Sequence, residues 1–177
     1  MKGIPYGVTN YDLIRKENLY YVDKTDFIPK LENSDAFVTF LRPRRFGKTL
    51  NMDMLNCFFS SEYADRADLF EGMKIWNDEK YRNLQGKYPV IYLSFAGIKD
   101  TNLKEAMKSI NTVICNAFDC IRPFVTEPCM TKTDMEFADG VNLDLDKVTA
   151  QMSVNFLCKM MFQKYGIKPI ILLDEYD

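Results

Sequence analysis

The sequence has no histidine among its 177 residues. This absence removes the Ser-His and Cys-His pairs that activate nucleophiles in many hydrolases. No C-x-x-C pair is present either, which argues against a structural zinc site. The cysteines are odd in number and widely spaced, so we expect reduced thiols that pack as small hydrophobic side chains: Cys57, Cys115, Cys120, Cys129 and Cys158.

The sequence also lacks a long apolar run, and its net charge is only -2. The longest aliphatic run, Ile170 to Leu173, is far too short to span a bilayer, and the N-terminus has no signal-peptide core. With 47% apolar and 27% charged residues, the composition is that of a globular domain with one sizeable core. We therefore expect a cytoplasmic protein without general attraction to nucleic acid or membranes.

A strand, a basic loop and a helix are predicted in succession between Ala36 and Phe59. The strand is indicated by Phe37, Val38, Phe40 and Leu41, and the helix by Leu50, Met54, Leu55, Phe58 and Phe59. Gly47 and Lys48 open the helix, whose first amides are unpaired and whose dipole favours an anion. In such a phosphate-binding loop, Lys48 would reach the β and γ phosphates and Thr49 would help to hold Mg²⁺.

The loop lacks one glycine of the usual G-x-x-x-x-G-K-[ST] pattern, because Arg42 stands at its place. Pro43 also offers no N–H to a phosphate. The cations of Arg42, Arg44 and Arg45 would offset the lost amide contacts. The predicted nucleotide-binding residues are therefore Arg42, Pro43, Arg44, Arg45, Phe46, Gly47, Lys48, Thr49 and Leu50. The alternative is a turn before an ordinary helix.

A second apolar run, Pro169 to Leu173, is followed by Asp174 and Glu175. This pattern is typical of a buried parallel strand whose carboxyl end carries a site, and it resembles a Walker B strand. Asp174 would then hold the Mg²⁺ shell, and Glu175 would orient and deprotonate the attacking water. The alternative is a core strand that ends in surface carboxylates, but both motifs in one chain favour a nucleotide site.

Four motifs together resemble the bacterial AAA-ATPase-like domain family: R-P-R-R-F-G-K-T from Arg42, Y-V-D-K-T from Tyr21, G-K-Y-P-V-I-Y-L-S-F from Gly86 and L-L-D-E-Y-D from Leu172. The arginine-rich loop is that family's own version of the phosphate-binding motif. The resemblance covers the whole chain and implies ATP as the nucleotide. It also implies that longer members continue into a restriction-nuclease-like domain.

The resemblance implies an α/β fold of the P-loop NTPase type, a three-layer α/β/α domain with a parallel sheet. In its additional-strand (AAA-like) class the strand order is 5-1-4-3-2, so this chain would be truncated after the third, Walker B strand. We therefore expect the front part of a longer protein. In isolation it should form homo-oligomers through its open sheet edges, rearrange so that its first and third strands pair, or be poorly stable. Nucleotide binding should be weak, and ATP turnover undetectable, in this form.

The remaining sequence adds one further strand and several helices to a single domain over residues 1–177. The strand is Val90–Phe95, and the helices are Asp23–Leu31, Glu62–Leu69, Asp78–Leu84, Leu103–Ile121 and Leu145–Tyr165. Residues 1–35 form an N-terminal arm, in which Tyr6, Tyr20 or Tyr21 would stack on adenine or pack in the core. Residues 122–144 read as an inserted loop, a lid or partner surface.

Two alternatives to a Mg²⁺-dependent ATPase follow from the same residues. The incomplete loop suits a catalytically inactive, nucleotide-gated scaffold that regulates a partner or an attached nuclease domain. The cations of Arg42, Arg44, Arg45 and Lys48 would otherwise contact nucleic acid. That footprint is small in an acidic chain, so nucleic acid is not the expected partner of this segment.

Overall fold

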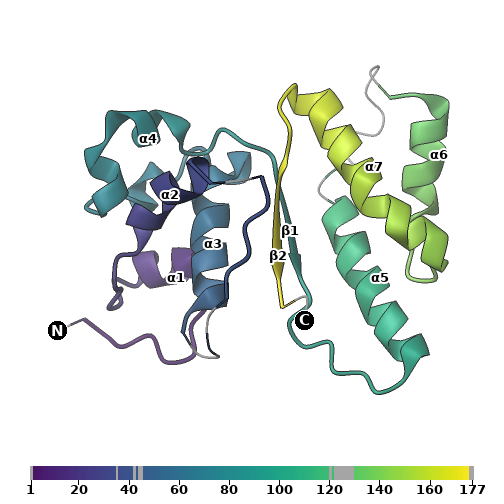
Figure 1. Ribbon diagram of the computed structural model, residues 1–177, viewed down its shortest axis with the longest axis horizontal. Helices are drawn as coiled ribbons and strands as arrows, with labels where there is room; N and C mark the ends of the chain where they lie inside the picture. The colour runs from purple at the N-terminus through teal and green to yellow at the C-terminus, as the bar shows by residue number, and fades with distance from the viewer. Residues whose placement is uncertain are drawn as a thin grey trace. The chain divides into compact units, whose positions relative to one another are not determined.

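The computed structural model describes residues 2–34, 36–41, 43, 46–119, 121 and 130–175 (Figure 1). The chain forms two compact units, Met1–Tyr88 and Pro89–Asp177, and each is described by itself. Together they show an α/β fold with a small parallel sheet. Within the described residues, no helix has the length and apolar character needed to cross a membrane.

The first unit is helical and is built around α3 (Lys48–Phe59), whose predicted position is confirmed. Helix α3 packs against α1 (Tyr11–Lys16) and buries Met54, Leu55, Cys57 and Phe58. The other elements are α2 (Ile28–Glu32), α4 (Glu79–Leu84) and the 3₁₀ helices η1 (Thr25–Phe27), η2 (Ser61–Tyr63), η3 (Ala67–Leu69) and η4 (Lys74–Asn77).

Aromatic side chains hold the first unit together. Phe70 is fully buried between Tyr11, at a ring distance of 5.4 Å, and Phe58, at 5.1 Å. The single tryptophan, Trp76, stacks on Phe70 at a ring distance of 6.3 Å, so it packs in this cluster. Such pairs add to the stabilisation that burial of apolar area provides.

The second unit consists of two parallel strands covered by helices. Strand β1 (Val90–Ser94) pairs with β2 (Ile170–Asp174), in a register that runs from Val90↔Ile170 to Ser94↔Asp174. Helices α5 (Leu103–Asp119) and α7 (Lys147–Tyr165) lie on the same side of the strands (Figure 1). These two helices and both strands confirm the predictions to within two residues. The core includes Ile91, Leu93, Phe118, Leu157 and Met160.

The strand predicted at Phe37 to Leu41 is not formed. Residues 36–41 carry no strand, and Phe37 and Leu41 are 94% and 89% exposed. Phe40 instead contacts Phe27, at a ring distance of 4.9 Å. A strand exists only where its backbone groups have a hydrogen-bonding partner, and among the described residues β1 and β2 pair with each other alone.

The prediction of an inserted loop over 122–144 was wrong for part of its length, because helix α6 (Lys132–Gly140) lies there. Residues 122–129 are outside the described part of the chain. A capping box starts α6: Thr131 Oγ1 accepts the N–H of Asp134, and the Asp134 carboxylate accepts the N–H of Thr131. This reciprocal pair satisfies two amides that the helix leaves unpaired.

Asp134 should make the free energy of unfolding of the second unit depend on pH in the acidic range. Its carboxylate receives Lys159 Nζ at 2.6 Å and Thr131 Oγ1 at 2.8 Å, and the hydrogen bond from Lys159 is the main cause of its lowered pKa. The ionised form therefore stabilises the fold at neutral pH, and this contribution is lost as pH falls below about 4 through the lowered pKa. Asp134→Asn should cost about 1–3 kcal/mol at pH 7, measured by urea unfolding.

The difference between Asp134→Asn and the parent should shrink as pH approaches 3. Asp139→Asn, at an exposed position on the same helix, is the matched control and should leave stability within about 0.5 kcal/mol of the parent. Equal losses in both variants would show that the ion pair with Lys159 contributes nothing.

Candidate functional site

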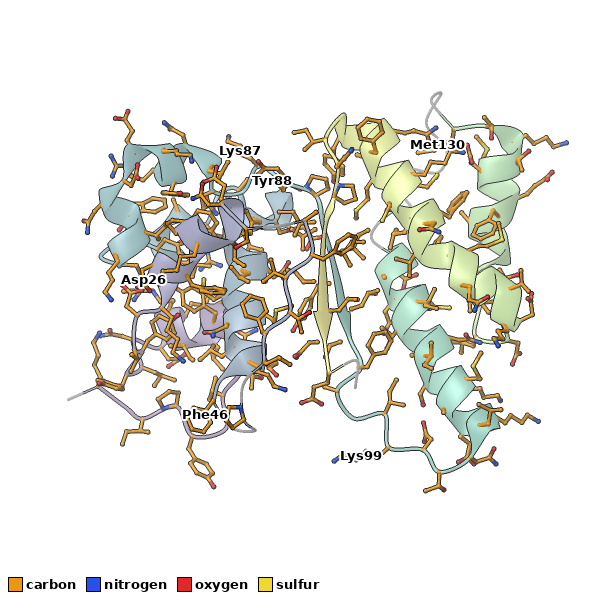
Figure 2. The ribbon with its side chains drawn as sticks, in the orientation of Figure 1. Asp26, Phe46, Lys87, Tyr88, Lys99 and Met130 are labelled. Carbon is orange, nitrogen blue, oxygen red and sulfur yellow. The ribbon has the colours of Figure 1, made fainter. Side chains whose placement is uncertain are left out.

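The predicted phosphate-binding loop leads into α3 through a glycine in the left-handed conformation. Gly47 has φ 73° and ψ 33°, a region that favours glycine, and Lys48 and Thr49 form the first turn that follows. Pro43 accepts the N–H of Phe46 at 3.4 Å, and Phe46 is 61% exposed (Figure 2). Arg42, Arg44 and Arg45 lie outside the described residues.

The start of α3 presents backbone donors that have no acceptor within the described part of the chain. Its first helical hydrogen bond joins Asn51 N–H to Gly47 O at 3.0 Å, and no side chain of a described residue caps this end. Among the described residues, the amides of Lys48, Thr49 and Leu50 donate to no acceptor. A left-handed residue followed by right-handed ones directs successive amides into an anion-binding concavity. The geometry suits a phosphate group.

One basic side chain from outside the predicted motif also reaches this loop. Lys24 Nζ lies 3.6 Å from the point that a Cβ on Gly47 would occupy. Sequence reasoning missed Lys24 as a site residue, although the Y-V-D-K-T motif contains it.

At the carboxyl end of β2, Asp174 is buried, and one of its oxygens has no partner in the described part of the chain. The residue is 4% exposed, and its backbone carbonyl accepts the N–H of Phe95 at 3.0 Å. Its Oδ2 is buried without a hydrogen-bond partner among the described residues. Buried carboxylate oxygens are normally satisfied, so an unpaired one at a strand end fits a ligand to a hard cation or its water.

Glu175 follows directly, and its backbone departs from the strand. Its φ is 51°, one of two positive values at non-glycine residues in the described chain, and its side chain is exposed. Backbone of this kind costs free energy and occurs often at functional positions. Glu175 therefore lies beyond the end of β2, whereas Asp174 is the last residue of the strand.

The candidate residues thus form two groups, one in each unit. Lys48 and Thr49 share the first turn of α3, and Asp174 and Glu175 are adjacent at the end of β2. In the described part of the chain, no three cysteine or acidic side chains gather as a metal centre would require. A divalent cation here would therefore take most of its ligands from phosphate and water, as Mg²⁺ commonly does.

The three tyrosines considered for adenine stacking differ in their surroundings. Tyr6 and Tyr20 are 97% and 59% exposed. Tyr21 packs edge-on against Tyr11 at 5.2 Å, and burial raises its pKa to about 12. Tyr21 therefore has the packing role that the sequence offered as the alternative to stacking.

A family model described as "Predicted AAA-ATPase" matches residues 5–177. The chain belongs to this predicted AAA-ATPase family. Membership confirms the resemblance that the four motifs carry, and it indicates an ATPase-like role with nucleotide binding in general terms.

A curated relative of this family member is the "Uncharacterized protein in vnfD 5'region" of Azotobacter chroococcum mcd 1. It is 33% identical over 97 residues, which make up 54% of this chain. The match covers 17% of the relative's own length. No solved structure matches the chain.

Proposed function

We propose that this chain binds Mg-ATP at the start of α3 and contributes the main residues of an ATPase site. The observation that carries the proposal is the set of amides after the left-handed Gly47 that have no acceptor among the described residues, in a member of a predicted AAA-ATPase family. An anion with several oxygens satisfies such donors and the helix dipole together.

Each candidate residue has a role that its chemistry supports. Lys48 neutralises the β and γ phosphates, and the loop arginines Arg42, Arg44 and Arg45 add charge. Thr49 and Asp174 would hold Mg²⁺, which would neutralise phosphate charge when bound. The Oδ2 of Asp174, which has no hydrogen-bond partner among the described residues, supports this assignment. Glu175 orients the attacking water and accepts its proton.

We also propose the additional-strand P-loop fold for this domain. Its strand order, 5-1-4-3-2, requires the second and third strands to be parallel neighbours. The pairing of β1 with β2, and the absence of pairing by residues 36–41 among the described residues, support this order.

A second candidate function keeps nucleotide binding and omits hydrolysis. Arg42 and Pro43 stand where the loop would otherwise supply a glycine and an amide, which favours a nucleotide-gated scaffold for a partner or an attached nuclease-like domain. Hydrolysis of bound ATP to ADP and phosphate distinguishes the two functions, because the scaffold would keep its ATP unchanged.

The binding proposal is tested by calorimetric titration of Mg-ATP, with Mg-GTP in parallel. Lys48→Ala should weaken Mg-ATP binding at least tenfold, because it removes a cation from the phosphate site. Lys30→Ala, which changes an exposed lysine of α2, should leave the affinity unchanged. If Lys48→Ala binds Mg-ATP as tightly as the parent, the assignment is wrong.

A further inference from the structure

The Y-V-D-K-T motif at Tyr21 to Thr25 contains a clamp that fixes the backbone on both sides of Lys24. Asp23 Oδ1 accepts the N–H of Thr25 at 2.9 Å and its hydroxyl at 2.7 Å. Asp23 Oδ2 accepts the N–H of Lys74, the first residue of η4, at 2.7 Å. The carboxylate of Asp23 therefore ties this segment to η4.

Thr25 completes the clamp from the other side. It is fully buried, and its hydroxyl accepts the N–H of Ile75 at 3.1 Å. Tyr21 packs against Tyr11, as described above. These contacts give Tyr21, Asp23 and Thr25 a structural role in the motif. None of the contacts involves the amino group of Lys24.

The charge of Lys24 lies where a cation is otherwise unfavourable. The side chain is partly buried, and it forms no ion pair with a carboxylate among the described residues. Its Nζ lies against Gly47, the residue that precedes Lys48, and is therefore next to the positive end of the α3 dipole. Without an anion, this placement opposes like charges, whereas a bound phosphate reverses the sign of the interaction.

We propose that Lys24 is a second lysine ligand of the nucleotide phosphates, supplied from outside the phosphate-binding loop. This inference rests on the proposed function, since it concerns the same anion site. The Asp23–Thr25 clamp positions the residue so that its amino group meets the phosphate at Gly47. A charge supplied in this way compensates for Pro43, which has no amide to offer.

Calorimetric titration of Mg-ATP into the parent, Lys24→Met, Lys24→Arg and Lys30→Met tests the proposal. Lys24→Met should weaken binding about tenfold, because one charge-assisted contact is lost. Lys24→Arg should recover most of the affinity, and the exposed control Lys30→Met should lose none. The loss should be smaller for AMP, which has fewer phosphates to contact.

The outcomes separate the two proposals. If the parent binds Mg-ATP and Lys48→Ala does not, but Lys24→Met equals the parent, the inference about Lys24 is overturned and the proposed function stands. If the parent binds no nucleotide, both are overturned.

A second measurement does not depend on a variant. Acylation of lysines in the parent, mapped by mass spectrometry, should slow at Lys24 when Mg-ATP is added and remain unchanged at Lys30. An unchanged rate at Lys24 under saturating Mg-ATP would overturn the proposal even if Lys24→Met folded poorly.

Discussion

Gly86→Ala is expected to destabilise the first unit by about 2–5 kcal/mol. Gly86 has φ 68°, and a Cβ added to it would lie 2.4 Å from the Cα of Ala64. The neighbour is backbone and cannot rotate away, while the N–H of Gly86 is held by Phe58 O at 2.8 Å. The variant therefore combines an unfavourable backbone conformation with a steric clash.

Gly72→Ala is the matched control for Gly86→Ala. Gly72 has a similar φ of 76°, but nothing lies within 4 Å of the Cβ position, so only the backbone cost of about 1–2 kcal/mol remains. Urea unfolding followed by the fluorescence of Trp76 reports on this unit directly. Equal midpoints for the two variants would contradict the close approach to Ala64.

The same titration tests the prediction of a single domain. If residues 1–177 form one cooperative domain, the far-ultraviolet circular dichroism of all helices should be lost in the transition that Trp76 reports. Two separate transitions would contradict that prediction.

Asp174→Asn is expected to lower Mg²⁺-dependent ATP binding at least tenfold without loss of stability. The side chain is buried and Oδ2 is unpaired among the described residues, so the folded state carries the cost of a poorly satisfied carboxylate. Asparagine has nearly the same size and no charge. The variant should therefore be as stable as the parent, or more stable by about 1 kcal/mol, while it loses an anionic ligand for Mg²⁺.

Two measurements separate these effects of Asp174→Asn. Titration of ATP with and without Mg²⁺ gives the metal-dependent part of the affinity, and urea unfolding followed by circular dichroism gives the stability. If Asp174→Asn lowers the free energy of unfolding by more than about 1 kcal/mol, the carboxylate has a structural partner, which contradicts its assignment as a free ligand for Mg²⁺.

The elements best predicted from sequence are those whose pattern matches their packing. The 3.6-residue period of Leu103–Ile121 and the apolar run before Asp174 were sufficient for α5 and β2, because burial of those side chains forms the core. On α7, however, the apolar side chains of Val148 and Met152 are 62% and 54% exposed. Helical spacing of an apolar residue therefore does not by itself show that another element buries its side chain.

The strand that did not form and the helix that was missed have different physical causes. Phe37 to Leu41 have side chains that favour a strand, but a sequence pattern carries no information on whether a partner strand is present. Helix α6 was missed although its capping box, Thr131 with Asp134, is visible in the sequence. The helix lacks a clear period of apolar residues, because Asp134 and Ala138 are its only buried residues.

The candidate site was predictable where it consists of local motifs. Gly47 to Thr49 and Asp174 with Glu175 follow from short patterns next to predicted elements. The approach of Lys24 to Gly47 was not predictable, because it depends on the path of the chain through η1 and on the clamp of Asp23 to η4. Contacts between residues distant in sequence are set by tertiary packing.

The pairing of Val90 with Ile170 has a consequence for biosynthesis. Strand β1 leaves the ribosome about 80 residues before its hydrogen-bonding partner, a delay of about 4–16 s at ordinary rates of translation. Throughout that interval its alternating apolar side chains, Ile91 and Leu93, have neither a sheet nor α7 to cover them. The nascent chain therefore presents an unpaired apolar strand of the kind that chaperones bind and that aggregates when they do not.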